Sequence, residues 1–166
     1  MTDGRILWVT GGKTHDWLSI SGISFSIKRG KLLKLSSGWK PYGGGYQTPR
    51  YRTSGDLVVL SGLMRNSSGK WGHVATLPKS AAPKDSLVFN INHHEGTARL
   101  NITKDGKVYW GAGAKKYAWI SLDGVKYLRN PKTRLKTIGG WKGYGGGYPE
   151  PTATRIGDMV YLSVVI

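Results

Sequence analysis

The chain has 166 residues, among them 25 Gly, seven Trp and nine Tyr but no Cys. The absence of cysteine excludes a disulfide framework, a thiolate nucleophile and a thiolate zinc site, and the aromatic content excludes a disordered chain. The net charge is +16, from 25 Lys and Arg against 9 Asp and Glu, which predicts a polyanionic neighbour such as nucleic acid, a teichoic or sulfated glycan, or an acidic protein surface.

Short segments of alternating apolar and polar residues predict β-strands. In chain order they are 5–10, 17–27, 31–36, 56–64, 71–77, 86–92, 97–103, 107–110 and 117–122. The apolar positions change parity at Gly22, which predicts a β-bulge or turn there and at Gly124, and Asp105-Gly106 is a preferred pair for a type I′ hairpin turn. No segment has a sustained helical period. The chain is predicted to be all-β, an antiparallel β-sandwich or jelly-roll-like module.

One stretch occurs twice and organises the sequence. Gly-Trp-Lys-Pro-Tyr-Gly-Gly-Gly-Tyr at 38–46, the first glycine loop, returns 102 residues later as Gly-Trp-Lys-Gly-Tyr-Gly-Gly-Gly-Tyr at 140–148, the second glycine loop. The same offset also relates 55–61 to 157–163 and 4–22 to 106–124. Three consecutive glycines predict a loop of residues with positive φ. A period this long indicates domain duplication rather than a solenoid.

The offset divides the chain into three predicted segments. Residues 1–27 correspond to the C-terminal half of a module, 28–129 form one complete module, and 130–166 correspond to the N-terminal half of another. The sequence holds no second copy of 65–102. Two arrangements stay open at this point: the terminal segments pair with each other into a reduced second lobe, or they complete their sheets with neighbouring chains.

The basic residues are scattered along the chain. They occur singly or in pairs such as Lys28-Arg29 and Lys115-Lys116, with no helix that could enter a groove, so nucleic-acid binding is the less favoured partner class. No apolar run has membrane-spanning length, and the first residues lack the apolar core of a signal peptide. We therefore expect neither membrane insertion nor classical secretion.

The sequence offers no recognisable catalytic or metal-binding set. Asp56 and Asp158 are the only acids that recur, and each follows a glycine before a predicted strand, which favours a turn. His93 and His94 are adjacent and would point to opposite faces of a strand, while His15 and His73 have no spaced partner. No phosphate loop or nucleophile elbow is present. We expect no enzyme, no cofactor and no metal site.

The aromatic residues of the two glycine loops are the best candidates for a contact surface. Flat rings beside lysines suit stacking on sugar faces or contact with another protein. The candidate contacts are Trp39, Lys40, Tyr42, Tyr46, Trp141, Lys142, Tyr144 and Tyr148. The alternative is that the rings close the ends of the sandwich. That alternative is favoured for Trp39 and Trp141, whereas for the tyrosines the two interpretations are equally supported. Trp17 and Trp119 are predicted to be core residues.

An ordered set of short motifs resembles the β-rich distal modules of tailed-phage fibre and tail proteins. The motifs are Gly-Trp-x-x-Tyr-Gly-Gly-Gly-Tyr-x-x-Pro (38–49), Gly-Asp-Leu-Val-Val-Leu-Ser-Gly-Leu (55–63), Ala-Thr-Leu-Pro (75–78), Ala-Arg-Leu-Asn-Ile (98–102) with Asp105-Gly106, and Trp-Ile-Ser-Leu-Asp-Gly-Val-x-Tyr (119–127). The resemblance covers residues 33–127, and similar modules occur in virion surface proteins of large DNA viruses. It implies a non-enzymatic virion component, often trimeric and often involved in host-surface attachment.

Three functions follow as hypotheses. The first is a viral structural protein located in the virion, a capsid- or tail-associated fibre or decoration subunit. Its partners would be other virion proteins, further copies of itself with a trimer favoured, and an anionic host-surface glycan. The alternative is a free carbohydrate-binding module, a lectin that uses both glycine loops. The third is nucleic-acid binding, which predicts a steep loss of affinity with salt.

Overall fold

The computed structural model describes residues 6, 20–21, 23–68, 70–94, 96–113 and 117–163. The strand predicted at 5–10, apart from residue 6, residues 17–19 of the strand predicted at 17–27, and the predictions for His15, Trp17 and Gly22 lie outside these residues. Residues 20–21 and 23–27 of the second segment are described and belong to no strand, so the prediction was wrong for that part. Within the described part of the chain the backbone forms fifteen strands and no helix, which confirms the all-β class. The described residues contain no helix that is long and apolar enough to span a membrane.

The strands are short and every pairing between them is antiparallel. In chain order they are β1 (Lys31–Leu32), β2 (Lys34–Leu35), β3 (Trp39–Pro41), β4 (Arg50–Ser54), β5 (Leu57–Ser61), β6 (Leu63–Asn66), β7 (Gly72–Thr76), β8 (Leu87–His93), β9 (Gly96–Ile102), β10 (Lys107–Gly113), β11 (Trp119–Ser121), β12 (Lys126–Leu128), β13 (Thr133–Arg134), β14 (Thr152–Ile156) and β15 (Met159–Ser163). Strands β3, β4, β12, β13, β14 and β15 are additional to the predicted set.

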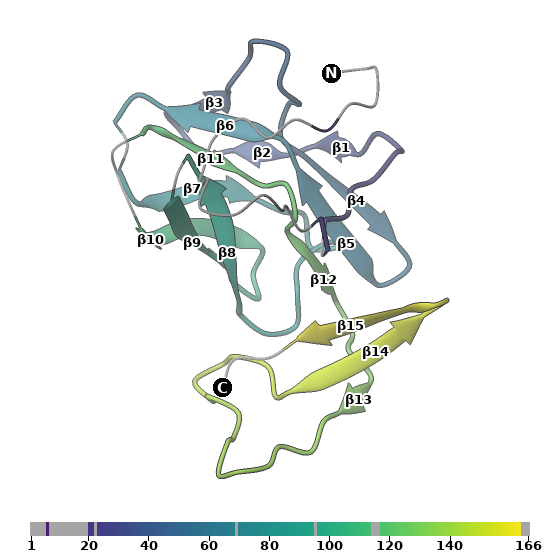
Figure 1. The fold of residues 1–166 in the computed structure, drawn as a ribbon. Helices are drawn as coiled ribbons and strands as arrows, with labels where there is room; N and C mark the ends of the chain where they lie inside the picture. Colours follow the sequence, from purple (N-terminus) through teal and green to yellow (C-terminus); the bar gives the residue numbers. More distant parts are fainter. Residues whose placement is uncertain are drawn as a thin grey trace, which may run out of the picture.

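Residues 31–128 form a sandwich-like arrangement of two layers (Figure 1). One layer is the five-stranded sheet β2-β7-β10-β9-β8. The other contains the sheets β1-β4-β5-β12 and β11-β6-β3, which are linked because β5 of one is followed directly in the chain by β6 of the other. A single apolar cluster lies between the layers and includes Leu60 from β5, Ile120 from β11 and Leu100 from β9. In β9 the buried residues alternate with exposed or partly exposed ones, as a strand with one covered face requires.

Gly62 divides the strand predicted at 56–64 into β5 and β6, which belong to different sheets. Its φ is 102°, and a Cβ at this position would lie 2.6 Å from the Thr48 carbonyl oxygen. Only glycine tolerates both conditions. The prediction of one continuous strand was therefore wrong, because a close approach of two backbone segments is invisible in an apolar run.

The hairpin between β9 and β10 also differs from its prediction. A type I′ turn needs positive φ at both central residues, but only Gly106 has it, at 82°. The Gly106 N–H instead donates to the Thr103 carbonyl, 2.8 Å away, and the Thr103 N–H donates to the Lys107 carbonyl at 2.9 Å. The turn is therefore a longer loop that closes with a glycine of positive φ.

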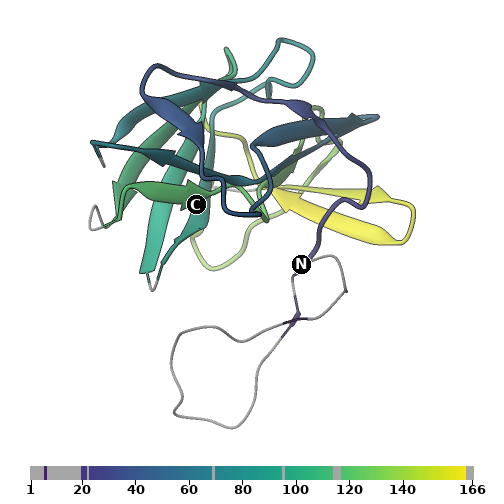
Figure 2. The same ribbon diagram turned by 90° about the horizontal axis from the view of Figure 1, so that it is seen from above.

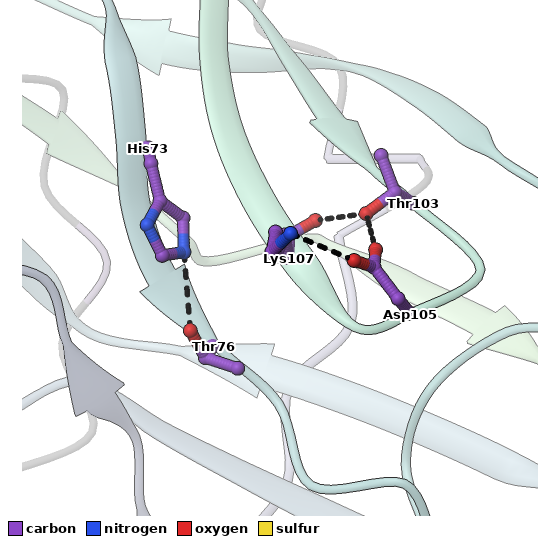
Figure 3. Close-up of polar contacts among 5 residues, drawn as sticks. All are labelled: His73, Thr76, Thr103, Asp105 and Lys107. Atoms are coloured by element: carbon purple, nitrogen blue, oxygen red, sulfur yellow. Dashed lines mark hydrogen bonds and ion pairs between the residues drawn. The ribbon is translucent and has the colours of Figure 1, made fainter.

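A polar cluster stabilises this hairpin (Figure 3). The Thr103 hydroxyl donates to the Asp105 carboxylate, and the Lys107 ammonium lies 3.0 Å from the same carboxylate. Both contacts favour the charged acid and lower the pKa of Asp105 from 3.8 to about 2. Asp105 in turn raises the pKa of Lys107. On neighbouring β7, the His73 imidazole forms a separate hydrogen bond with the Thr76 hydroxyl, at 3.1 Å.

The fourth sheet, β13-β14-β15, lies beside the sandwich, below it in Figure 1 and to its right in Figure 2. Its strands begin 102 residues after β1, β4 and β5, and the register is the same: Lys31 pairs with Tyr51 as Thr133 pairs with Ala153. Local hydrogen bonds repeat too, since the Leu33 N–H donates to Pro49 and the Leu135 N–H to Pro151. Duplication of a whole module stays a prediction.

Candidate ligand-binding cleft

The first glycine loop contains β3 and, after it, a glycine turn that orients two tyrosine rings. Gly43, Gly44 and Gly45 all have positive φ, at 82°, 62° and 83°, which confirms the predicted conformation. The Tyr46 N–H donates to the Gly43 carbonyl at 3.1 Å and closes the turn. The turn brings the rings of Tyr42 and Tyr46 edge to face, with centroids 5.3 Å apart and planes at 87°.

Backbone hydrogen bonds fix this loop on β6. The Tyr42 N–H donates to the Leu63 carbonyl at 3.0 Å, and the Leu63 N–H donates to the Gln47 carbonyl at 2.9 Å. The loop is thereby held at both ends by the first residue of β6. Its tyrosines are presented from a rigid support, which favours their use as contact residues.

A cleft of about 480 Å³ opens beside the loop. It is lined by Tyr42, Tyr46, Gln47, Leu63, Asn92, His94, Trp119, Ser121 and Asp123. These side chains come from the loop and the residue after it, from the start of β6, from the end of β8, from β11 and from the turn that follows β11. Segments distant in the sequence therefore combine into one site, of the size and mixed apolar and polar lining typical of ligand sites.

One wall of the cleft is aromatic. The Tyr42 ring lies between those of Tyr46 and Trp119, and it meets Trp119 edge to face with centroids 6.4 Å apart and planes at 76°. The Arg65 guanidinium lies 5.6 Å from the centroid of the Tyr42 ring, a cation–π contact that holds this ring in place. Trp119 is half-buried, so the expectation of a pure core residue is only partly met.

The cleft also carries polar groups. The Asp123 carboxylate accepts a hydrogen bond from the Gly62 N–H at 2.9 Å and one from the Ser121 hydroxyl at 3.0 Å. These bonds orient the carboxylate but use only part of its capacity, because an ionised carboxylate offers about four acceptor sites. The side chains of Asn92 and Gln47 are exposed and supply both donors and acceptors. The site can therefore hydrogen-bond several hydroxyl groups at once.

The two adjacent histidines have different roles. His93, the last residue of β8, is buried; its Nε2 lies 2.6 Å from the Tyr117 carbonyl oxygen and its ring packs against Trp110. His94 has left the strand with φ of 57°, and its ring stacks on that of Tyr117 with centroids 4.0 Å apart. His93 is therefore a core residue, whereas His94 contributes to the cleft.

A second hollow of about 310 Å³ adjoins the cleft. It is lined by Lys40, Tyr42, Arg65, Asn66, Ser67, Ala118 and Trp119. Tyr42 and Trp119 line both depressions, so the aromatic wall has a different environment on each side. The cleft holds an acid and amides, whereas the second hollow holds the cations Lys40 and Arg65.

Trp39, a predicted contact residue, belongs to the core. It is only 8% exposed, and its ring meets that of Trp110 edge to face at 6.0 Å. The alternative interpretation holds for this residue. Its counterpart Trp141 is 63% exposed, so the expectation that it closes a sandwich end was wrong for the described structure. Trp39 is covered by Trp110 of β10, whereas Trp141 is exposed.

The second glycine loop has the same local geometry but lies elsewhere. Tyr144 and Tyr148 meet edge to face with centroids 5.6 Å apart, and Tyr144 and Lys142 are exposed. The Arg99 guanidinium donates to the Tyr148 hydroxyl at 3.2 Å, and the Ser86 N–H donates to the Gly147 carbonyl at 2.9 Å. This loop is thus attached to the sandwich near the start of β8, and none of its residues lines the cleft.

The remaining predicted residues lie in turns. Asp56 accepts a hydrogen bond from the Asn130 amide at 2.7 Å, and Asp158 is ion-paired with Arg155 at 3.5 Å. The two acids thus have local structural partners. Across the described ranges, no group of three or more His, Asp or Glu side chains is placed to hold a metal ion.

Most of the cleft's polar residues were absent from the predicted site. Gln47, Asn92, His94, Ser121 and Asp123 carry no signal of binding in the sequence, although Ser121 and Asp123 belong to the motif at 119–127. They meet because β11 pairs with β6 and also approaches β8. Only this tertiary arrangement identifies them.

Comparison with known proteins gives one structural likeness. No protein-family model matches the sequence, and no curated protein matches it. Among solved structures, the chain is similar to the receptor binding protein (gp15) of Listeria phage PSA, with 24% sequence identity and a TM-score of 0.49. The likeness covers 60% of this chain and 63% of that protein.

Proposed function

We propose that the chain is a non-enzymatic virion subunit that attaches to a host surface by holding a surface glycan in the cleft. The observation that carries this proposal is the aromatic wall of Tyr42, Tyr46 and Trp119 facing the polar groups of Asp123, Asn92 and Gln47. Sugar rings have apolar faces that stack on aromatic side chains and hydroxyls that pair with carboxylates and amides. The virion location draws on the motif resemblance over residues 33–127.

The chemistry of the cleft supports binding rather than catalysis. Among the described residues that line it, Asp123 is the only carboxylate, whereas glycoside cleavage ordinarily uses two facing carboxylates. Its oxygens already accept hydrogen bonds from Gly62 and Ser121, as a positioned acceptor would. The expected activity is reversible binding without turnover.

The geometry favours one glycan site per chain over the two equal sites of the alternative lectin hypothesis. The second glycine loop repeats the tyrosine pair, but the Tyr148 hydroxyl is engaged by Arg99. The sequence holds no second copy of 65–102, so Asn92 and His94 have no counterpart at the 102-residue offset. A titration should therefore saturate at one glycan per chain.

The test is a glycan-array screen of the full chain, followed by calorimetric titration of the strongest glycan. Tyr46→Ala and Asn92→Ala each remove an exposed side chain from the cleft and should weaken binding about tenfold or more. Two variants serve as matched controls. Tyr144→Ala removes an equally exposed tyrosine of the second glycine loop, and Asn90→Ala removes the exposed asparagine two residues earlier on β8. Both should bind as the unmodified chain does.

Three results would overturn this function: no glycan bound by the full chain, unchanged affinity in both cleft variants, or equal losses in the controls. The virion assignment has its own test. An antibody raised against the chain should label intact virus particles and block their adsorption to cells. Labelling confined to free protein would leave a soluble lectin as the function.

A further inference from the structure

Strand β15 has an open edge at the position where its counterpart is paired. β5 pairs with β4 on one side and with β12 on the other, whereas β15 pairs only with β14 among the described residues. An open edge presents unpaired N–H and C=O groups and is ordinarily covered in native proteins. The 102-residue correspondence between β5 and β15 specifies which segment should cover it.

That segment is residues 24–26, which correspond to β12. Phe25 is 81% exposed, whereas its counterpart Tyr127 is 5% exposed. Likewise Val160 of β15 is 60% exposed, whereas its counterpart Val58 is fully buried. Residues 24–26 and β15 therefore both carry exposed apolar side chains at positions whose counterparts in β12 and β5 are buried.

The two halves lie close together within one chain. Ser24, Val59, Lys126 and Tyr161 all line one hollow of about 310 Å³. At the 102-residue offset Ser24 corresponds to Lys126, and Val59 corresponds to Tyr161. This hollow therefore contains the pair Lys126 and Val59 together with its equivalent, Ser24 and Tyr161. The Lys126 ammonium also donates to the Ser24 hydroxyl at 2.6 Å. In the sandwich, Lys126 and Val59 are direct cross-strand neighbours.

We propose that residues 24–26 add to the open edge of β15 in the same chain as an antiparallel strand. The register follows that of β12 on β5. The pairs are Ser24 with Tyr161, Phe25 with Val160, and Ser26 with Met159. This pairing extends the β13-β14-β15 sheet to four strands and covers its edge against association with other chains. The sequence left open whether the terminal segments pair with each other or with neighbouring chains, and this proposal selects pairing within one chain. The proposal does not rest on the proposed function.

Disulfide trapping tests the pairing, because the sequence contains no cysteine. In the sandwich the Leu60 N–H donates to the Val125 carbonyl, and the Arg129 N–H donates to the Asp56 carbonyl. Leu60–Val125 and Asp56–Arg129 are therefore hydrogen-bonded pairs of this ladder. Lys126 and Val59 therefore form a non-hydrogen-bonded pair, whose side chains lie closer together. The double variant Ser24→Cys/Tyr161→Cys should form an intrachain disulfide. Lys126→Cys/Val59→Cys is the matched control at the corresponding pair.

A register control separates strand pairing from simple proximity. Ser24→Cys/Val160→Cys places the two thiols on opposite faces of the sheet, so it should cross-link at a small fraction of the yield of the first variant. Migration on a non-reducing gel and the intact mass distinguish intrachain from interchain disulfides. Disulfide-linked dimers would overturn the proposal in favour of strand exchange between copies.

Amide hydrogen exchange on the unmodified chain gives an independent test. In the proposed register Phe25 and Val160 form a hydrogen-bonded pair, so both amides should exchange at least about tenfold more slowly than amides of exposed loop residues such as Gly44. Unprotected amides at both positions would overturn the proposal, whatever the yield of the disulfide variants.

Discussion

Trp39 and Trp110 meet edge to face in the core, with ring centroids 6.0 Å apart and ring planes at 71°. Trp39→Ala should therefore lower the free energy of unfolding by about 3–5 kcal/mol, because it removes a large buried ring and leaves a cavity. Trp141→Ala, in the same local sequence but exposed, should change it by about 0.5 kcal/mol or less. Urea denaturation of both variants checks this, and equal losses would place the second tryptophan in a core as well.

Gly62→Ala should destabilise the sandwich and weaken ligand binding together. The new Cβ would meet the Thr48 carbonyl oxygen at 2.6 Å, and the Gly62 N–H holds Asp123 in the cleft. Strain and steric overlap predict a loss of about 2 kcal/mol or more in the free energy of unfolding. Gly55→Ala is the control: its φ is also positive, at 55°, but its Cβ would meet no atom within 4 Å. A larger loss in the control would contradict the steric argument.

The polar cluster of the hairpin between β9 and β10 should make a small contribution to the free energy of unfolding, and this contribution should be lost in acid. The folded state lowers the pKa of Asp105 from 3.8 to about 2, so its stabilising contribution is present above pH 3.8 and is lost as the pH falls toward 2. Asp105→Asn should flatten the dependence of the urea midpoint on pH in this window. Lys107→Gln, which removes one of two partners, should flatten it less. An unchanged slope in Asp105→Asn would show that the pair does not persist in solution.

Glycan binding should depend on salt through Lys40 if the glycan is anionic. Lys40 and Arg65 line the hollow behind the aromatic wall, where they would meet a phosphate, sulfate or carboxylate group. Lys40→Gln should weaken binding about two- to fivefold at low salt and reduce the salt dependence. The control Lys142→Gln removes the same charge from the second glycine loop. Titrations between low and high salt check this, and equal salt slopes in all three proteins would indicate a neutral glycan.

Much of the sandwich could be predicted from local patterns. The alternation of Ala98, Leu100 and Ile102 predicts β9 correctly, because a strand with one covered face buries every second residue. The division of β5 from β6 at Gly62 could not be predicted, since it depends on a backbone contact with Thr48. Local sequence reports the period of an element but not which distant segment lies against it.

Because local sequence does not show which distant segments meet, only part of the cleft could be predicted. Tyr42 and Tyr46 were recognised as contact candidates because they flank a repeated glycine triplet, and the structure places both in the cleft. Trp39 and Trp141 have nearly identical neighbours in the sequence but opposite exposure, because burial depends on whether another sheet covers them. Asn92 and Asp123 could be identified only once β8 and β11 were known to be adjacent.

Strand β8 separates the second glycine loop from the cleft. Ser86, directly before the strand, holds the second glycine loop, and Asn92, near its other end, lines the cleft. The six residue steps from Ser86 to Asn92 span about 20 Å at the rise of an extended strand. A neighbouring subunit bound to the second glycine loop would leave the cleft open to solvent, so under the proposed function assembly and glycan binding would use separate surfaces.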